Sequence, residues 1–152
     1  MGITSSCFKS NNSSPPSPTP ISSIEGDELT ALFSSAHSSA NIILSDAKYE
    51  LYTKEAIIKF LNYNLTNNRT YITEGHDCDD FAKILLGDYT KWASSNKTQK
   101  ASTFGIAYGI INNISHAVNL FVDSEKKIWF VEPQSDRIFT LTDNDRITFI
   151  YL

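Results

Sequence analysis

Apolar positions recur at helical spacing in the first half of the 152-residue chain and alternate as in strands in the second half. The first half predicts three helices. They are a short helix that begins at Asp27, a helix capped by Thr53 and ended by Asn67, and a helix capped by Asp77. Segment 42–44 is apolar but too short to assign, and segment 71–73 is expected to be a short strand.

The third predicted helix has the clearest pattern. Its apolar positions follow one helical face: Cys78, Phe81, Ala82, Leu85 and Tyr89. Acidic residues occupy its first turn, where the helix dipole favours negative charge. Cysteine therefore stands at the start of a helix whose apolar face is expected to pack against the rest of the domain.

Short strands separated by tight turns follow this helix. The expected strands are 104–111, 117–122, 127–131, 137–141 and 146–151. Consecutive strands with short connections favour an antiparallel β-meander. Helices first and sheet second predict an α+β fold, in which the N-terminal helices, with the helix of Cys78 at the core, pack on a C-terminal meander.

Composition fits one folded domain and a tail. Hydrophobic residues make up 41% of the chain, enough for one core, which we place at residues 25–152. Residues 1–24 are rich in Ser, Pro and Asn and predict a disordered tether. The net charge of −4, with no basic block, argues against a nucleic-acid partner. The sequence predicts no cofactor and does not define the oligomeric state.

The tail carries a short pattern for lipid attachment. Gly2 and Ser6 match the N-myristoylation pattern, and Cys7 lies where a palmitate would strengthen a single acyl anchor. Only two cysteines are present, Cys7 and Cys78, in different settings, which suits a reducing compartment. These features predict a cytoplasmic protein that reaches a membrane surface through its acylated N-terminus, as a viral or bacterial effector would.

Three residues have the order and placement of a thiol-based catalytic site. Cys78 stands at a helix start, where the dipole favours a thiolate, and His116 opens a predicted strand. Glu132 closes the next strand, and a tight hairpin brings the start of one strand close to the end of the next. Glu132 is therefore expected to hold the imidazole of His116 in one tautomer.

Other residues are expected to support this site. Asn119 and Gln134 are weaker candidates for orienting the histidine or supporting the oxyanion, and the backbone N–H of Cys78 could donate to an oxyanion. A metal site is the competing interpretation of the same segment. Its ligands would come from His76, Asp77, Asp79, Asp80, His116 and Glu132. Adjacent helical residues point in different directions, so few of these side chains can converge.

The chain resembles the transglutaminase-like, papain-like superfamily of cysteine hydrolases in three short runs. These are Cys78-Asp79-Asp80-Phe81-Ala82, His116-Ala117-Val118-Asn119 and Val131-Glu132-Pro133-Gln134. Small phage and bacterial members look closest. The resemblance covers residues 75–141, and it implies that Cys78 is a nucleophile, His116 its base and Glu132 the orienting acid. Glutamate stands where that superfamily usually has aspartate, and the carboxylates around Cys78 oppose a thiolate.

The function expected from this resemblance is a cysteine peptidase or amidase that acts on a protein or peptide through a thioester. One alternative is acyl transfer or deamidation at the same site. The other is a non-catalytic binding module on a degenerate hydrolase fold, in which Cys78 and His116 are ordinary core residues.

Overall fold

The computed structural model describes residues 18–94 and 101–152. Within these ranges it contains the three predicted helices, and their bounds are α1 (Gly26–Ala36), α2 (Lys54–Tyr63) and α3 (Cys78–Ser94). A short 3-10 helix, η1 (Thr66–Asn68), follows α2. The hydroxyl of Thr53 caps α2 by accepting a hydrogen bond from the backbone N–H of Ala56 at 3.2 Å, as predicted.

The strands form two sheets. The larger one has six strands in the order β2-β9-β5-β6-β7-β8. Their bounds are β2 (Asn41–Ile43), β5 (Gly105–Ile111), β6 (Ile114–Val122), β7 (Ile128–Glu132), β8 (Arg137–Phe139) and β9 (Arg146–Tyr151). The smaller one has the order β1-β3-β4, with bounds β1 (Ser22–Glu25), β3 (Lys48–Leu51) and β4 (Ala101–Ser102). The five predicted C-terminal strands are therefore confirmed, within a residue or two at most ends.

The predicted arrangement of a C-terminal antiparallel meander under N-terminal helices is wrong. Four strands come from outside the predicted meander, and β2 pairs with β9 in parallel. The last strand, β9, lies inside the sheet between β2 and β5 rather than beside β8. The fold is thus a mixed α/β body built on two sheets. The prediction failed because β2 has only three residues, too few to show a strand pattern. Its partner β9 lies far along the chain, so no turn in the sequence indicates that the two strands pair.

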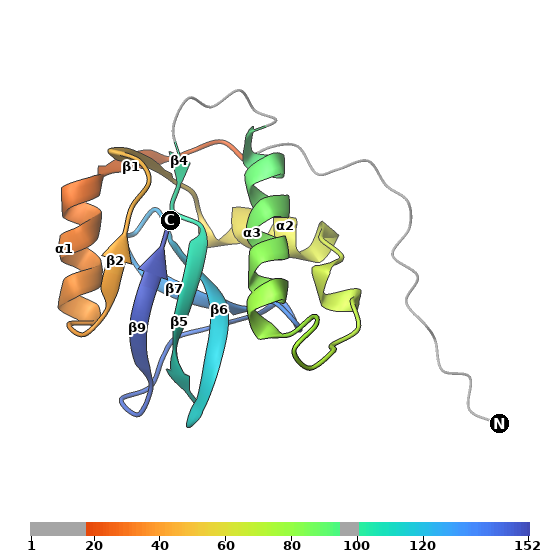
Figure 1. The fold of residues 1–152 in the computed structure, drawn as a ribbon. Coiled ribbons are helices and arrows are strands. Elements are labelled where there is room, and N and C mark those ends of the chain that lie inside the picture. The colour runs from red at the N-terminus through yellow and green to blue at the C-terminus, as the bar shows by residue number, and fades with distance from the viewer. Residues whose placement is uncertain (1–17, 95–100) are drawn as a thin grey trace.

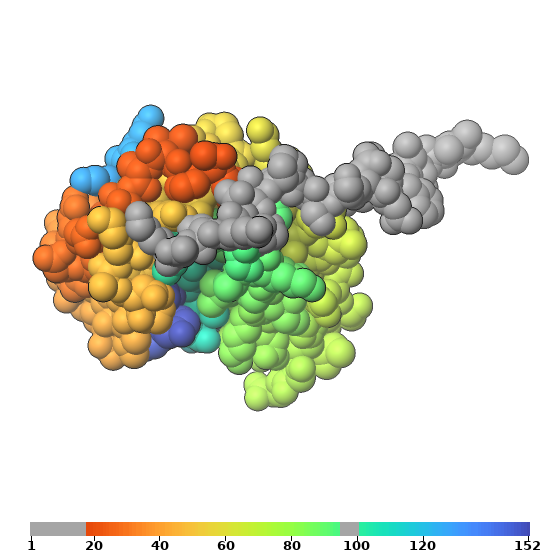
Figure 2. Space-filling view, turned by 90° about the horizontal axis from the view of Figure 1, so that it is seen from above, coloured from red at the N-terminus to blue at the C-terminus, as the bar shows by residue number. Residues whose placement is uncertain are grey.

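The larger sheet has α1 on one side and α2 and α3 on the other (Figure 1), and an apolar cluster lies on each side. Leu29 and Phe33 of α1 pack on one face, against Val118 and Leu120 of β6. On the other face α2 and α3 share a core with Phe121 of the same strand. Because these helices pack on opposite faces of the sheet, α1 and α3 lie on opposite sides of the molecule when it is seen from above (Figure 2). The N-terminus of α3 is thereby held against β6, where the candidate site lies.

The predicted tether lies mostly outside the described residues, and so do the proposed acylation positions Gly2 and Cys7. Residues 22–24, which the prediction assigned to the tether, belong to β1 and pair with β3. In the described part of the chain, none of the helices has the length and apolarity to cross a bilayer. Acylation and membrane attachment remain proposals.

Candidate functional site

Cys78 is the first residue of α3, as predicted. The backbone N–H of Phe81 donates to the carbonyl of Asp77 at 3.0 Å, which is the first hydrogen bond of the helix. The thiol is free and half-buried. It packs against a small cluster that includes Ala82 of α3 and Ala117 of β6, the residue that follows His116. The apolar face of α3 therefore brings the cysteine to the strand that carries the histidine.

The β6–β7 hairpin brings His116 and Glu132 together. Asn119 pairs with Val131 in this hairpin, and the Nε2 atom of His116 lies 2.7 Å from the Oε2 atom of Glu132. Only 14% of the His116 side chain and 16% of the Glu132 side chain are exposed. The predicted proximity of the two residues is confirmed. Among the described residues, however, no hydrogen bond joins Cys78 to either of them.

Opposing effects set the charge of Glu132. Burial raises the pKa of its carboxyl, while the hydrogen bond and charge of His116 lower it. The backbone N–H of Gln134, which donates to Oε1 at 3.3 Å, and the nearby Arg137 also lower it. The net result is a pKa below the ordinary value for glutamate, so this side chain is a carboxylate at neutral pH.

This balance gives a titration test. In the variant His116→Gln, burial remains but the main stabilising partner is lost, so the pKa of Glu132 should rise above its value in the unaltered protein. Side-chain carboxyl NMR across pH 2–7 measures it, with the exposed Glu125 as internal control. Because the folded pKa is lowered, the pair contributes stability above the ordinary glutamate pKa, and this contribution disappears as pH falls through the folded pKa. An unchanged Glu132 titration in His116→Gln would contradict the pairing.

Asn119 and Gln134, which the sequence suggested as supports for the histidine or the oxyanion, make other contacts in the structure. Asn119 is fully buried, and its side-chain amide donates to the carbonyls of Ala82 at 2.9 Å and Gly105 at 3.1 Å. From its place in β6 it therefore holds both α3 and β5, and no described hydrogen bond joins it to the histidine. Gln134 reaches Glu132 through its backbone N–H, not through its amide.

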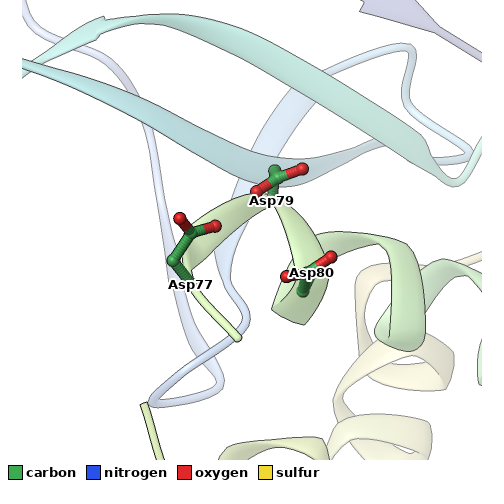
Figure 3. A group of neighbouring side chains, drawn as sticks. All are labelled: Asp77, Asp79 and Asp80. Atoms are coloured by element: carbon green, nitrogen blue, oxygen red, sulfur yellow. The ribbon is translucent and has the colours of Figure 1, made fainter. Parts of the chain in front are cut away.

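Three carboxylates surround the start of α3 (Figure 3). One oxygen from each of Asp77, Asp79 and Asp80 lies within 4.8 Å of the others. Lys83 pairs with Asp79 and, at 3.5 Å, with Asp80. A hydrogen bond between Asp77 and Asp79 raises the pKa of Asp77 and lowers that of Asp79. Of the metal ligands suggested by the sequence, these three form the one group of three that converges within the described residues, while His116 and Glu132 contact each other. The ring of His76 lies tilted against Phe81, with 4.6 Å between the ring centroids.

Sequence reasoning missed a set of aromatic residues beside this site. Tyr108 of β5 and Phe149 and Tyr151 of β9 line a groove along α3. They come together because β9 pairs with β5. No signal in the sequence could have grouped them, since nothing along the chain shows that the last strand returns to the middle of the sheet.

Among the solved structures that share this fold are two in which about a quarter of the aligned residues are identical to this chain. One, described as the PSL1a–E64 complex, has a TM-score of 0.77 and 25% sequence identity, covering 86% of this chain and 50% of that chain. The other is the crystal structure of Polyporus squamosus lectin bound to the human-type influenza-binding epitope Neu5Aca2-6Galb1-4GlcNAc. It has a TM-score of 0.74 and 24% identity, covering 86% of this chain and 49% of that one. The chain thus spans about half the length of these proteins.

A comparison of the sequence with protein-family models also indicates an agglutinin domain. The family model described as Agglutinin C-terminal matches residues 49–138, which is more than half of the chain and includes Cys78, His116 and Glu132. Among curated protein sequences, none matches. One of the structural neighbours binds a glycan, and neither description names a protein or peptide substrate.

These findings contradict the assignment to the transglutaminase-like, papain-like superfamily, because they name an agglutinin family and a lectin. The predicted activities depended on that assignment and are wrong with it: the cysteine hydrolase, the acyl transferase or deamidase, and an enzyme in general. The alternative of a non-catalytic binding module agrees better with the comparisons, although not on a degenerate hydrolase fold. The roles of Cys78, His116 and Glu132 stay predictions. The chain belongs to the Agglutinin C-terminal family.

Proposed function

We propose that this chain is a carbohydrate-binding module and that its ligand contacts the His116–Glu132 pair at the start of α3. The observation that carries the proposal is the match to the Agglutinin C-terminal family across residues 49–138. The lectin bound to a sialylated trisaccharide supports it by analogy of fold. Because the chain covers half of that lectin, the proposal concerns this domain alone.

The polar pair has the chemistry that sugar recognition needs. The Glu132 carboxylate accepts hydrogen bonds, and His116 offers a ring nitrogen that donates or accepts according to its tautomer. Hydrogen bonds to an ionised group contribute about 1.5–3 kcal/mol each, more than bonds between neutral groups. Both side chains are mostly buried, which holds them in one geometry for a ligand. We place Cys78 beside this pair as part of the wall of the site.

A glycan array followed by calorimetry tests the proposal. The trisaccharide of the lectin complex and the neutral disaccharide that remains without its sialic acid are the first probes. Glu132→Gln keeps the size of the side chain but removes its charge, so it should weaken binding about tenfold or more. Glu125→Gln makes the same change in the exposed β6–β7 turn and should bind like the unaltered protein. Absence of binding to every glycan on the array would refute the proposal.

The thiol provides an independent check. The variant Cys78→Ser should bind glycan within about twofold of the unaltered protein, because serine is similar in size and a binding site needs no nucleophile. Incubation with E64 is the matching chemical probe, since one structural neighbour is a complex with it. A covalent E64 adduct on Cys78 in intact-mass spectra, or peptide cleavage that is lost in Cys78→Ser, would contradict a non-catalytic module.

A further inference from the structure

The chain enters the fold beside the β6–β7 turn. Ile21 is the last residue before β1, and its backbone N–H donates to the carbonyl of Leu51 at the end of β3 at 2.9 Å. The carbonyl of the next residue, Tyr52, accepts a hydrogen bond from the N–H of Ser124 in the turn. Ile21 is 63% exposed, so an apolar side chain stands open to solvent at the point where residues 1–17 join the described part of the chain.

This entry point and the His116–Glu132 pair lie at opposite ends of the molecule. The pairing of Val122 with Ile128 closes the β6–β7 hairpin at its turn, whereas His116 and Glu132 lie at the open end. From His116 to Val122 the strand covers about 20 Å, at roughly 3.3 Å per residue. Figure 1 shows the same separation, with β1 at the upper end and the start of α3 at the lower end.

Two lysines at the entry end are held together by one aromatic ring. The ammonium groups of Lys54 and Lys127 lie 3.5 Å and 4.0 Å from the centre of the Trp129 ring. Trp129 is itself fixed, because its indole N–H donates to the buried Asp123 at 2.6 Å. Within the described residues neither lysine forms an ion pair. The ring therefore keeps two positive charges at one place on the surface.

The other charged groups at this end are balanced or turned aside. Lys126 is paired with Glu28 of α1, so it adds no net charge. Glu55 follows Lys54 in the first turn of α2, and successive side chains point about 100° apart around a helix. Glu125 is the exposed carboxylate of the turn. Positive charge is therefore concentrated at the lysine pair, and Glu125 is the group that opposes it.

We propose that the lysine pair rests on an anionic phospholipid surface to which the acylated N-terminus is attached. The acylation pattern at Gly2 and Cys7 precedes the entry point, and residues 1–17 span at most about 60 Å when fully extended. One acyl chain alone binds a bilayer weakly, and lysines near the surface of an anionic leaflet strengthen the attachment. The His116–Glu132 pair then faces away from the bilayer and stays open to a ligand. The inference is independent of the proposed carbohydrate binding.

Vesicle sedimentation of the whole chain tests the proposal. The protein is produced with N-myristoyltransferase, its acylation is verified by intact mass, and it is mixed with vesicles of phosphatidylcholine alone or with phosphatidylserine added. Lys54→Gln together with Lys127→Gln should weaken binding to the anionic vesicles about tenfold or more and leave binding to the neutral ones unchanged. Glu125→Lys should strengthen binding to the anionic vesicles. Arg146→Gln is the matched control, because Arg146 is an exposed cation at the open end of the hairpin.

Hydrogen exchange on the vesicles gives the orientation. Backbone amides of residues 123–127 should exchange more slowly in the bound protein, while those of the β5–β6 turn, residues 112–113, should exchange as in solution. Equal binding to neutral and anionic vesicles overturns the proposal, and so does slowed exchange at residues 112–113 alone. A chain that the transferase leaves unacylated overturns it as well. A negative glycan array has no bearing on this result, because no sugar enters the experiment.

Discussion

Replacing Asn119 by aspartate should lower the free energy of unfolding by about 4 kcal/mol at neutral pH. The amide of Asn119 donates to two carbonyls, those of Ala82 and Gly105, in a place where none of the side chain is exposed. An aspartate carboxylate in the same place would be repelled by these two carbonyl oxygens, because neither it nor they carry a hydrogen to donate. Both the lost hydrogen bonds and the buried charge oppose folding.

The size of this loss should depend on pH in a defined direction. Burial raises the pKa of such a carboxyl in the folded state, so the deficit is complete above that raised pKa and shrinks as pH falls toward the ordinary value for aspartate. Urea unfolding of Asn119→Asp at pH 4 and pH 7 measures both values. The exposed turn residue Asn144 provides the control, since Asn144→Asp makes the same chemical change in solvent. Equal effects of the two variants would mean that Asn119 has no special role.

Alanine at position 109 should cost about 3 kcal/mol of stability. A Cβ at Gly109 would lie 2.2 Å from the carbonyl oxygen of Arg146 and 2.9 Å from the Cα of Ile147. These are backbone atoms of β9, and the register between β5 and β9 shifts at this point, so the two strands approach too closely for a side chain. One or both strands would have to move.

A second glycine gives the matched comparison. No described atom lies within 4 Å of a Cβ at Gly87, which is exposed in the middle of α3. Gly87→Ala should therefore stabilise the protein by about 0.5–1 kcal/mol, because alanine restricts the unfolded chain and favours the helix. Urea midpoints that shift in opposite directions for the two variants are the expected result. A Gly109→Ala protein as stable as the unaltered one would show that β5 and β9 are not packed as described.

Local structure was largely predictable from the sequence, while long-range pairing was not. The start of α3 at Cys78 follows from its helical spacing and acidic first turn, and the β6–β7 hairpin follows from alternation around a polar turn. The same hairpin argument correctly brought His116 to Glu132. The position of β9 between β2 and β5 depends on contacts among distant segments, which no local pattern encodes.

The chemical interpretation failed for a related reason. Cysteine, histidine and glutamate occur in the same order in proteins of different families. A short motif therefore fixes the residue types but not the family or the function. Asn119 shows the same limit. Its place after His116 suggested a role in the site, whereas its burial between Ala82 and Gly105 assigns it to holding a helix on a sheet.

The position of β9 also bears on how the protein is made. Its two neighbours, β2 and β5, are synthesised earlier, yet the six-stranded sheet cannot close until residues 146–151 are available. On the ribosome, β5 would therefore expose an unpaired edge for as long as the last strand remains in the exit tunnel. Folding of the larger sheet must follow release of this strand, and nascent chains stalled before Arg146 should be the most prone to aggregate or to bind chaperones.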